Sequence, residues 1–436
     1  MGKIAMRDII AEALQYYTAS SSHRNTFRIL FRMKDRINSR MLQLAAAQAL
    51  KRYPYYAVRC VTDGREYLLE PNDEQLVVRC TPDPVDLGGE DSNGYLLAVS
   101  YWEDVIWINV FHGLADGAGI MEFGRTLLYY YCLERYDANL SSDGIRVNDG
   151  PVPEEEWGNP YVKIMSGERE LPDEKDILIK LKADTSVSPL NIFEDPRITV
   201  GEPWYWHIRI SEKQLMEYCR AQDGTPGVVI SLLMSRAIDR LNPDNEHPIV
   251  TGMAVSLRGA LEAPLYKGSP LTLAYLPYSG KIKEKSFDFQ ATISRGRLLL
   301  AVDKERLQAG IKSSSRLYAA LDRCPTVEAK RQLANEVVAR YMGASTFQVS
   351  YMGPSRLAAI EPYVVETEPQ NDGNGLTIEI MASHGFFFLE IVQLWKEDLY
   401  IQAFLDELTA QGIEFERLDS GIHKVPDIVL PDGSEN

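Results

Sequence analysis

Hydrophobic and polar residues alternate clearly in the first third of the chain. Residues 26–33 (TFRILFRM) have the two-residue period and the β-rich composition of a strand, and residues 39–52 have the period of an amphipathic helix. Residues 95–101 and 105–111 predict two further strands joined as a hairpin, and a helix follows from about residue 118 to 133. The first third therefore contains a strand–loop–helix unit.

The second half of the chain starts a new series of elements after a long polar interval. Strand-like and helix-like stretches again follow one another, which indicates mixed sheets with helices packed on them. The remaining elements that the pattern predicts are a hairpin over 55–61 and 66–70, strands over 204–210, 249–257 and 346–351, helices over 211–221 and 228–241, long helices between 288 and 340, a hairpin over 376–381 and 386–393, and a helix over 398–411.

The interval from about residue 137 to 202 is polar, rich in Pro and Gly, and without a sustained period. Aromatic residues such as Trp157 and Tyr161 recur in it, so we expect an ordered crossover with short helical pieces. A chain of 436 residues is too long for one ordinary core. We therefore expect an α/β (α+β) fold with an N-terminal lobe over 1–150, a crossover over 151–202 and a C-terminal lobe over 203–436.

Charge and composition limit the classes of partner that the protein can bind. The formal net charge is -16, which argues against a general nucleic-acid binder because such a protein needs a basic face. One local basic pocket would still suffice for a small ligand that carries phosphate. No apolar run approaches the length of a membrane span, and the first residues lack the apolar core of a signal peptide.

The 5 cysteines are scattered and never form a C-x-x-C pair. This spacing suggests neither a disulfide framework nor a zinc site, and reduced thiols suit the cytoplasm, where we expect the protein. No bound metal or permanent cofactor is expected. No G-x-S-x-G elbow, P-loop or dinucleotide-binding glycine motif occurs, and no cysteine lies in a nucleophile motif.

One segment carries candidate chemistry, Val110-Phe-His-Gly-Leu-Ala-Asp-Gly117. It lies between a predicted strand and a predicted helix. A neutral imidazole, here His112, can remove a proton from an attacking heteroatom near pH 7. Asp116 can hold the loop by pairing with an arginine, and Gly117 allows a tight turn into the helix. The start of the helix directs N–H groups toward the site, which disfavours an imidazolium.

A structural explanation competes with this one. A single histidine beside an apolar strand is more often a core or turn residue, and Asp-Gly after a strand is a common turn. With only 6 histidines in the chain, however, the H-x-x-x-D-G spacing is rarely a chance product, and it falls between a strong strand and a strong helix.

The segment Phe111-His-Gly-Leu-Ala-Asp-Gly117 resembles the active-site motif of the chloramphenicol-acetyltransferase-like superfamily, written H-H-x-x-x-D-G or H-x-x-x-D-G. Three further segments are similar to elements of that superfamily in the same order: "ALKRYPYYAVRC" after the first helix, Ala254-Val-Ser-Leu-Arg258, and Phe347-Gln-Val-Ser-Tyr-Met-Gly353. The resemblance covers nearly the whole chain, and bacterial alcohol-acetyltransferase-like proteins are the most similar members. It implies two lobes with the active-site channel between them.

Within this resemblance, His112 is the general base and Asp116 a structural acid. Arg258 is the expected partner of Asp116, although it can also be an ordinary strand-end arginine. Ser350 is placed near a substrate carbonyl or the oxyanion; the alternative is a hydroxyl bonded to the backbone at a turn. Two positions depart from the family pattern: Phe111 replaces the first motif histidine, and Tyr351 replaces an asparagine.

The resemblance implies transfer of a short acyl group from acyl-CoA, as co-substrate, to the hydroxyl or amine of a small molecule. The expected attack is direct, without an acyl-enzyme. One alternative is a condensation-type enzyme that takes its acyl group from a carrier protein. The other is a non-catalytic binding relative that has kept the fold.

Other polar residues carry weaker signals. Lys281, Lys283 and Lys285 alternate, and we interpret them as a solvated strand face rather than a phosphate site. His207 is expected in the core or at the edge of its strand, and His423 at the surface.

Overall fold

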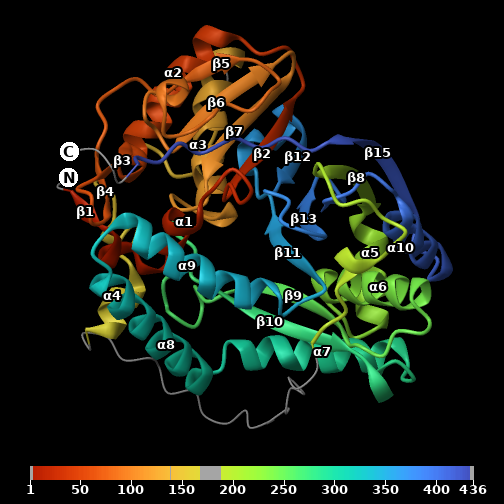
Figure 1. Cartoon of the computed structure of the whole chain (residues 1–436). Coiled ribbons are helices and arrows are strands. Elements are labelled where there is room, and N and C mark those ends of the chain that lie inside the picture. The colour runs from red at the N-terminus through yellow and green to blue at the C-terminus, as the bar shows by residue number, and fades with distance from the viewer. Residues whose placement is uncertain (1–2, 138, 167–187, 433–436) are drawn as a thin grey trace.

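The computed structural model of the chain describes residues 3–137, 139–166 and 188–432, and Figure 1 shows two halves, each built on its own sheet. The first sheet has five strands in the order β12-β2-β7-β6-β5. Most of its strand pairs are antiparallel, but β5 and β6 run parallel. The strands are β2 (Thr26–Met33), β5 (Val78–Cys80), β6 (Leu97–Trp102), β7 (Val105–Phe111) and β12 (Val364–Gln370).

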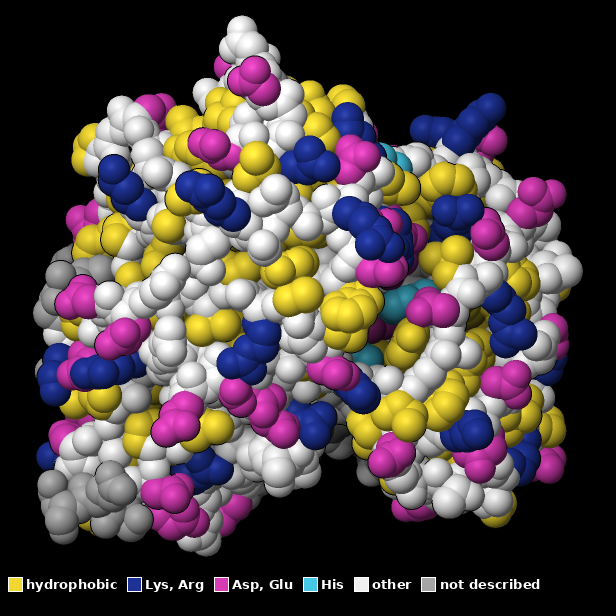
Figure 2. Space-filling view, turned by 90° about the horizontal axis from the view of Figure 1, so that it is seen from above, with side chains coloured by type: hydrophobic (Ala, Val, Ile, Leu, Met, Phe, Trp, Pro, Cys, Tyr) yellow, Lys and Arg dark blue, Asp and Glu magenta, His cyan; other side chains and the backbone are white. Residues whose placement is uncertain are grey.

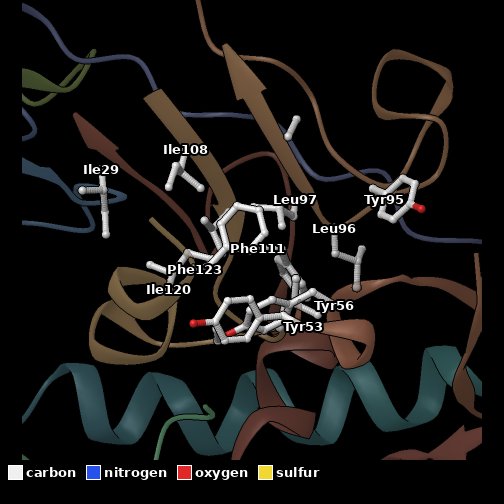
Figure 3. Packing of buried hydrophobic residues seen from close by; sticks show 14 of the residues in the cluster. Ile29, Tyr53, Tyr56, Tyr95, Leu96, Leu97, Ile108, Phe111, Ile120 and Phe123 are labelled. Carbon is white, nitrogen blue, oxygen red and sulfur yellow. The ribbon is translucent and has the colours of Figure 1, made fainter. Parts of the chain in front are cut away.

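Two helices cover one face of this sheet, α2 (Ser39–Arg52) and α3 (Gly117–Tyr136), and they pack against each other. Between them and the strands lies an aromatic and aliphatic core, shown in Figure 3, in which Ile108, Phe111 and Phe123 are fully buried. Burial of such side chains stabilises the fold by about 1.5–3 kcal/mol each. Because Phe111 is locked in this core, the position of the next residue, His112, is fixed by the sheet.

The second sheet has seven strands in the order β10-β9-β11-β13-β14-β8-β15. β11 runs parallel to both of its neighbours, so this sheet is also mixed. Its core contains α6 and α10. The elements are β8 (Trp204–Ser211), β9 (Ile249–Ser256), β10 (Leu271–Tyr278), β11 (Phe347–Pro354), β13 (Thr377–Ser383), β14 (Phe386–Gln393), β15 (Phe415–Ile422), α5 (Glu212–Ala221), α6 (Pro226–Leu241), α7 (Phe287–Ala301) and α10 (Leu399–Ala410).

Smaller elements join the halves. A three-stranded sheet, β1-β4-β3, lies beside the first half, and α1 packs on α9. None of the helices in the described ranges is long and apolar enough to cross a membrane. These elements are β1 (Ile4–Ala5), β3 (Val58–Thr62), β4 (Tyr67–Pro71), α1 (Ile10–Thr18), α4 (Pro160–Met165), α8 (Lys304–Arg323) and α9 (Val327–Met342).

The mixed α/β fold class expected from the sequence is confirmed. Of the predicted crossover over 151–202, residues 167–187 lie outside the described residues, and the rest contains α4 and two short 3₁₀ helices. The helix predicted from Ser211 is present, with the Ser211 hydroxyl accepting from the Gln214 N–H at its start.

Two expectations from the sequence are wrong. Lys281, Lys283 and Lys285 lie in a 3₁₀ turn and the turn after it, because Gly280 has a φ of 50° and β10 ends at Tyr278. His423 is not at the surface: it is 5% exposed, since its ring lies against the Asn371 carbonyl and the Glu390 carboxylate.

Candidate active site

His112 lies at the point where the strand β7 ends and the loop toward α3 begins. Its backbone N–H donates to the Asn25 carbonyl at 2.7 Å, which ties the loop to the start of β2. Four residues later Asp116 caps α3, and its Oδ1 accepts from the Gly119 N–H at 2.8 Å. The spacing of the motif thus places an imidazole and a helix-capping carboxylate at the two ends of one short loop.

Arg258 forms the ion pair with Asp116 that the sequence predicted. Its Nη2 lies 2.7 Å from Asp116 Oδ1, and the side chains are only 13% and 7% exposed. Burial alone would lower the pKa of Arg258, but the carboxylate of Asp116 outweighs it and raises that pKa. Arg258 also donates to the carbonyls of Tyr266 and Gly268, so the second half of the chain holds the motif loop through one guanidinium.

Ser269 contacts the imidazole itself. Its hydroxyl lies 3.3 Å from His112 Nδ1, and Ser269 N–H donates to the buried carboxylate of Glu12 at 2.7 Å. In the tautomer whose Nδ1 donates to this hydroxyl, Nε2 is the nitrogen left to accept a proton. Sequence reasoning missed both residues: Ser269 lies in no motif, and the only local signal for Glu12 is an acidic residue on the buried side of a helix.

The two glycines at the start of α3, Gly117 and Gly119, differ in what a side chain would meet at their positions. A Cβ at Gly117 would meet the flexible end of the Met352 side chain, whereas a Cβ at Gly119 would overlap the backbone carbonyl of Lys267. Lys267 also donates from Nζ to the Leu114 carbonyl at 2.6 Å. Gly119 is therefore the glycine that the close approach of the two segments requires.

All five predicted site residues, His112, Asp116, Gly117, Arg258 and Ser350, line one cavity of about 420 Å³. Its walls come from the motif loop, the start of β2, the strands β9 to β13 and the segment after β12. A cavity of this size suits a small-molecule ligand. Tyr351, where the family pattern has an asparagine, is 38% exposed and also contributes to the wall.

Two carboxylates that the sequence did not reveal line the same cavity, Asp372 and Glu379. Burial raises the pKa of both, and that of Glu379 reaches about 8 even though the Ser350 hydroxyl stabilises its charge. Glu379 is directly opposite Ser350 in the pairing of β11 with β13.

Glu379 should make stability depend on pH. Its pKa rises from 4.5 to about 8 on folding, so between these values the folded chain holds a proton that the unfolded chain has released. The free energy of unfolding therefore falls as the pH rises through this range. Glu379→Gln removes this contribution and should gain stability over the wild type from pH 5 to pH 8, as measured by urea unfolding. A difference that does not change with pH would refute the assignment; Glu103→Gln, at an exposed site, is the control.

Ser269→Ala should reduce turnover by up to about 100-fold through loss of ring orientation, with little effect on KM. The measurement is steady-state kinetics of the acyl transfer that the sequence predicts, with the concentrations of acyl-CoA and of the acceptor varied in turn. Ser256→Ala, which removes another hydroxyl from the wall of the His112 cavity, is the matched control. Equal effects of the two variants would contradict an orienting role for Ser269.

A smaller cavity of about 260 Å³ adjoins the first, and the two share Ala118, Arg258 and Met352. Basic side chains dominate its polar lining: Arg125, Arg146, Arg258, Lys267 and Arg356. Glu122 is its only acidic residue among the described residues, and it pairs with Arg125 and Arg146. In a chain with a net charge of -16, this is a local site suited to an anion.

No family model matches the sequence, and neither does any curated relative. Solved structures do match over nearly the full length. TRI101 of F. sporotrichioides, solved with coenzyme A and T-2, is 13% identical, with a TM-score of 0.57, over 96% of this chain and 100% of that one.

Two further solved structures have the same arrangement. The first condensation domain of the calcium-dependent antibiotic synthetase, solved with a substrate analogue, matches with a TM-score of 0.60 at 13% identity over 92% of this chain and 95% of its own. The chain has the chloramphenicol-acetyltransferase-like fold. TRI3 trichothecene 15-O-acetyltransferase from Fusarium sporotrichioides shares this fold at a TM-score of 0.52 and 10% identity, over 94% of this chain and 93% of that one.

The chloramphenicol-acetyltransferase-like fold explains why residues far apart in the sequence meet at His112. The motif loop comes from the first half, and Arg258, Ser269 and Ser350 come from the second. The expected resemblance is therefore confirmed at the level of the fold.

Proposed function

We propose that the protein is an acyltransferase that moves a short acyl group from coenzyme A to the hydroxyl or amine of a small acceptor. The observation that carries the proposal is the position of His112 on the wall of a 420 Å³ cavity, with Nδ1 bound to Ser269 and the Asp116–Arg258 pair holding its loop. Because the proposed donor is acyl-CoA, we place this protein in the cytoplasm. The two halves, which we assign to 1–150 and 203–436 with β12 of the second range joining the sheet of the first, would each supply part of the channel.

The proposed mechanism needs no acyl-enzyme. His112 Nε2 accepts the proton of the acceptor O–H or N–H while that oxygen or nitrogen forms a bond to the thioester carbon. The tetrahedral intermediate carries its negative charge on the former carbonyl oxygen, toward which Ser350 and the first N–H groups of α3 are assigned as donors. Collapse breaks the carbon–sulfur bond, and the thiolate of coenzyme A takes the proton from the imidazolium.

We assign the acyl-CoA donor to the basic cavity of about 260 Å³ that adjoins the His112 cavity. Phosphate groups of coenzyme A would meet the guanidinium groups of Arg125, Arg146 and Arg356, while the thioester reaches His112 through the shared wall. The Nε of Arg125 is buried without a hydrogen-bond partner among the described residues, so it has a donor to offer.

Arg356→Gln should raise the KM for acetyl-CoA about tenfold, the loss expected for one charge-assisted contact. It should leave the KM for S-acetylpantetheine, which has no phosphate, unchanged. Arg36→Gln removes an exposed guanidinium elsewhere and serves as the control. Equal effects on both donors would contradict the assignment of the phosphates to this cavity.

The function itself is tested by thiol release from acetyl-CoA across a panel of alcohols and amines. Release that depends on an acceptor would establish the acyltransferase and identify its substrate class. If no acceptor supports release, the free coenzyme A donor is wrong, and the same panel with a carrier-protein-bound acyl group then decides between a condensation-type enzyme and a non-catalytic relative.

A further inference from the structure

A third cavity, of about 600 Å³, borders the His112 cavity at Gln370, which contributes to the walls of both. It lies between the two sheets: β2, β7 and β12 form one side, and β8 with residues 416–424 forms the other. Figure 2 shows a hollow on this face between the two halves, with histidine side chains at its floor and charged side chains of both signs around it. The proposed acyl transfer uses none of these groups.

The wall from the first sheet offers hydrogen-bond donors that have no acceptor. Arg28 is 4% exposed, lies over the Trp107 ring at 4.8 Å, and makes only a 3.3 Å contact with the Pro82 carbonyl. Arg28 Nε and Trp107 Nε1 have no hydrogen-bond partner, and Arg28 forms no ion pair with any residue that the structure describes. Burial lowers the pKa of Arg28 to about 9, which still leaves it charged near pH 7. Asp83 and Glu390 act on this guanidinium only from beyond ion-pair distance, so a buried cation without a directly bound carboxylate suits an anionic ligand.

The opposite wall has a surplus of carboxylates around His207. Asp419 lies 2.7 Å from His207 Nδ1, Glu368 lies 3.4 Å from it, and Glu390 lies 3.5 Å from Nε2. His423 approaches Glu390 at 3.6 Å. Three carboxylates thus share two imidazole rings, and Asp419 also accepts from the Tyr205 hydroxyl at 2.9 Å.

Burial raises the pKa of Glu368 to about 8, so this carboxyl holds a proton near pH 7 unless a cation arrives to replace it. Glu390 Oε2 accepts a hydrogen bond from the Asn371 N–H at 2.6 Å, whereas Glu390 Oε1 has no hydrogen bond. Within the described residues, no group of His, Cys, Asp and Glu side chains has the arrangement of a metal site. The carboxylates on this wall therefore suit an ammonium group.

We propose that this cavity binds a small zwitterion, a free amino acid or a short peptide. Its carboxylate would pair with Arg28 and the Trp107 N–H, and its ammonium with Glu368 and Asp419. The two poles face the same 600 Å³ space, which accommodates a ligand larger than the two charged groups alone. Such a ligand gives Arg28 and the Trp107 N–H an acceptor and brings a cation to Glu368 and Asp419, whereas a simple amine or a simple acid provides only one of these contacts.

The test uses ligand-observed NMR and calorimetry on the full chain with free L-amino acids and Gly-X dipeptides as probes. Each probe is compared with its N-acetyl form and its C-terminal amide. At least one free probe should bind, and each cap should weaken binding about 10- to 100-fold, the loss expected for a contact between charged groups. Because only the ligand changes in this comparison, it does not depend on how a variant folds. Absence of binding by every probe, or equal binding of free and capped forms, overturns the proposal.

Variants then locate the site. In Arg28→Gln the free probe should bind no better than its amide, and in Glu368→Gln no better than its N-acetyl form. Arg417→Gln, an exposed guanidinium on the rim of the same cavity, is the matched control and should bind as the wild type does. His112→Ala should also bind normally, so failure of the proposed acyl transfer and failure of this inference give different results. Normal capping effects in both Arg28→Gln and Glu368→Gln would place the zwitterion elsewhere and overturn the assignment.

Discussion

Replacing His112 with alanine should lower kcat by roughly 10²–10⁴-fold, the contribution of a general base. The imidazole lies in the cavity that Asp116, Gly117, Arg258 and Ser350 also line, and its Nδ1 is bound to Ser269. No other histidine contributes to that cavity among the residues that the structure describes. Loss of the ring therefore removes the only imidazole that can take the acceptor's proton there.

The measurement is acceptor-dependent thiol release under saturating substrates, with circular dichroism to verify that the variant is folded. The KM for acyl-CoA should change little, because the phosphates of the donor are assigned to other residues. His247→Ala, which removes an exposed histidine, should keep wild-type turnover. Full activity of His112→Ala would rule out the proposed base.

Asp116→Ala should destabilise the chain by about 3–5 kcal/mol, because it leaves the buried guanidinium of Arg258 without its counterion. The substitution also removes the cap of α3, a smaller loss of about 1 kcal/mol. Asp116→Asn separates the two effects, since its amide oxygen can still accept from the Gly119 N–H while the negative charge is gone. We expect the asparagine variant to be more stable than the alanine variant by about the value of the cap.

Urea unfolding monitored by far-UV circular dichroism measures these differences. Adding Arg258→Met to Asp116→Ala should recover part of the lost stability, because the uncompensated cation is then absent. Glu103→Gln, which breaks the exposed pair with Arg36, should leave the free energy of unfolding nearly unchanged. If Asp116→Ala is no more destabilising than Glu103→Gln, the ion pair does not hold the motif loop.

The sequence predicts strands and helices well where one face is buried. β2, α2, β7 and β14 have the predicted bounds, and the other predicted elements begin and end within three residues of the predicted positions, because their periods follow the burial pattern. β10, β12 and β15 were missed for physical reasons. β12 (VVETEPQ) carries two glutamates and a proline, β10 contains Pro277, and β15 lies at a sheet edge, so none of them shows a clean alternation.

The residues of the candidate site also fall into those that the sequence predicts and those that it does not. His112, Asp116 and Gly117 form a local motif, and the resemblance added Arg258 and Ser350, all of which line one cavity. Ser269 and Glu12 were not predictable, since their role depends on a contact across 257 residues of chain that no local pattern records. Asp372 and Glu379 were missed for the same reason: an acidic residue in a polar loop or a strand gives no sign that it faces a cavity.

One strand connects the synthesis of the chain to its folding. β12 belongs to the first sheet, yet its residues, 364–370, leave the ribosome long after the other four strands of that sheet. Until then β2 is an open edge with unpaired N–H and C=O groups, a form that invites pairing with other chains. A fragment that stops before β12 would carry this edge permanently, so separate expression of the first half should yield an aggregating product even though its helices and most of its core are complete.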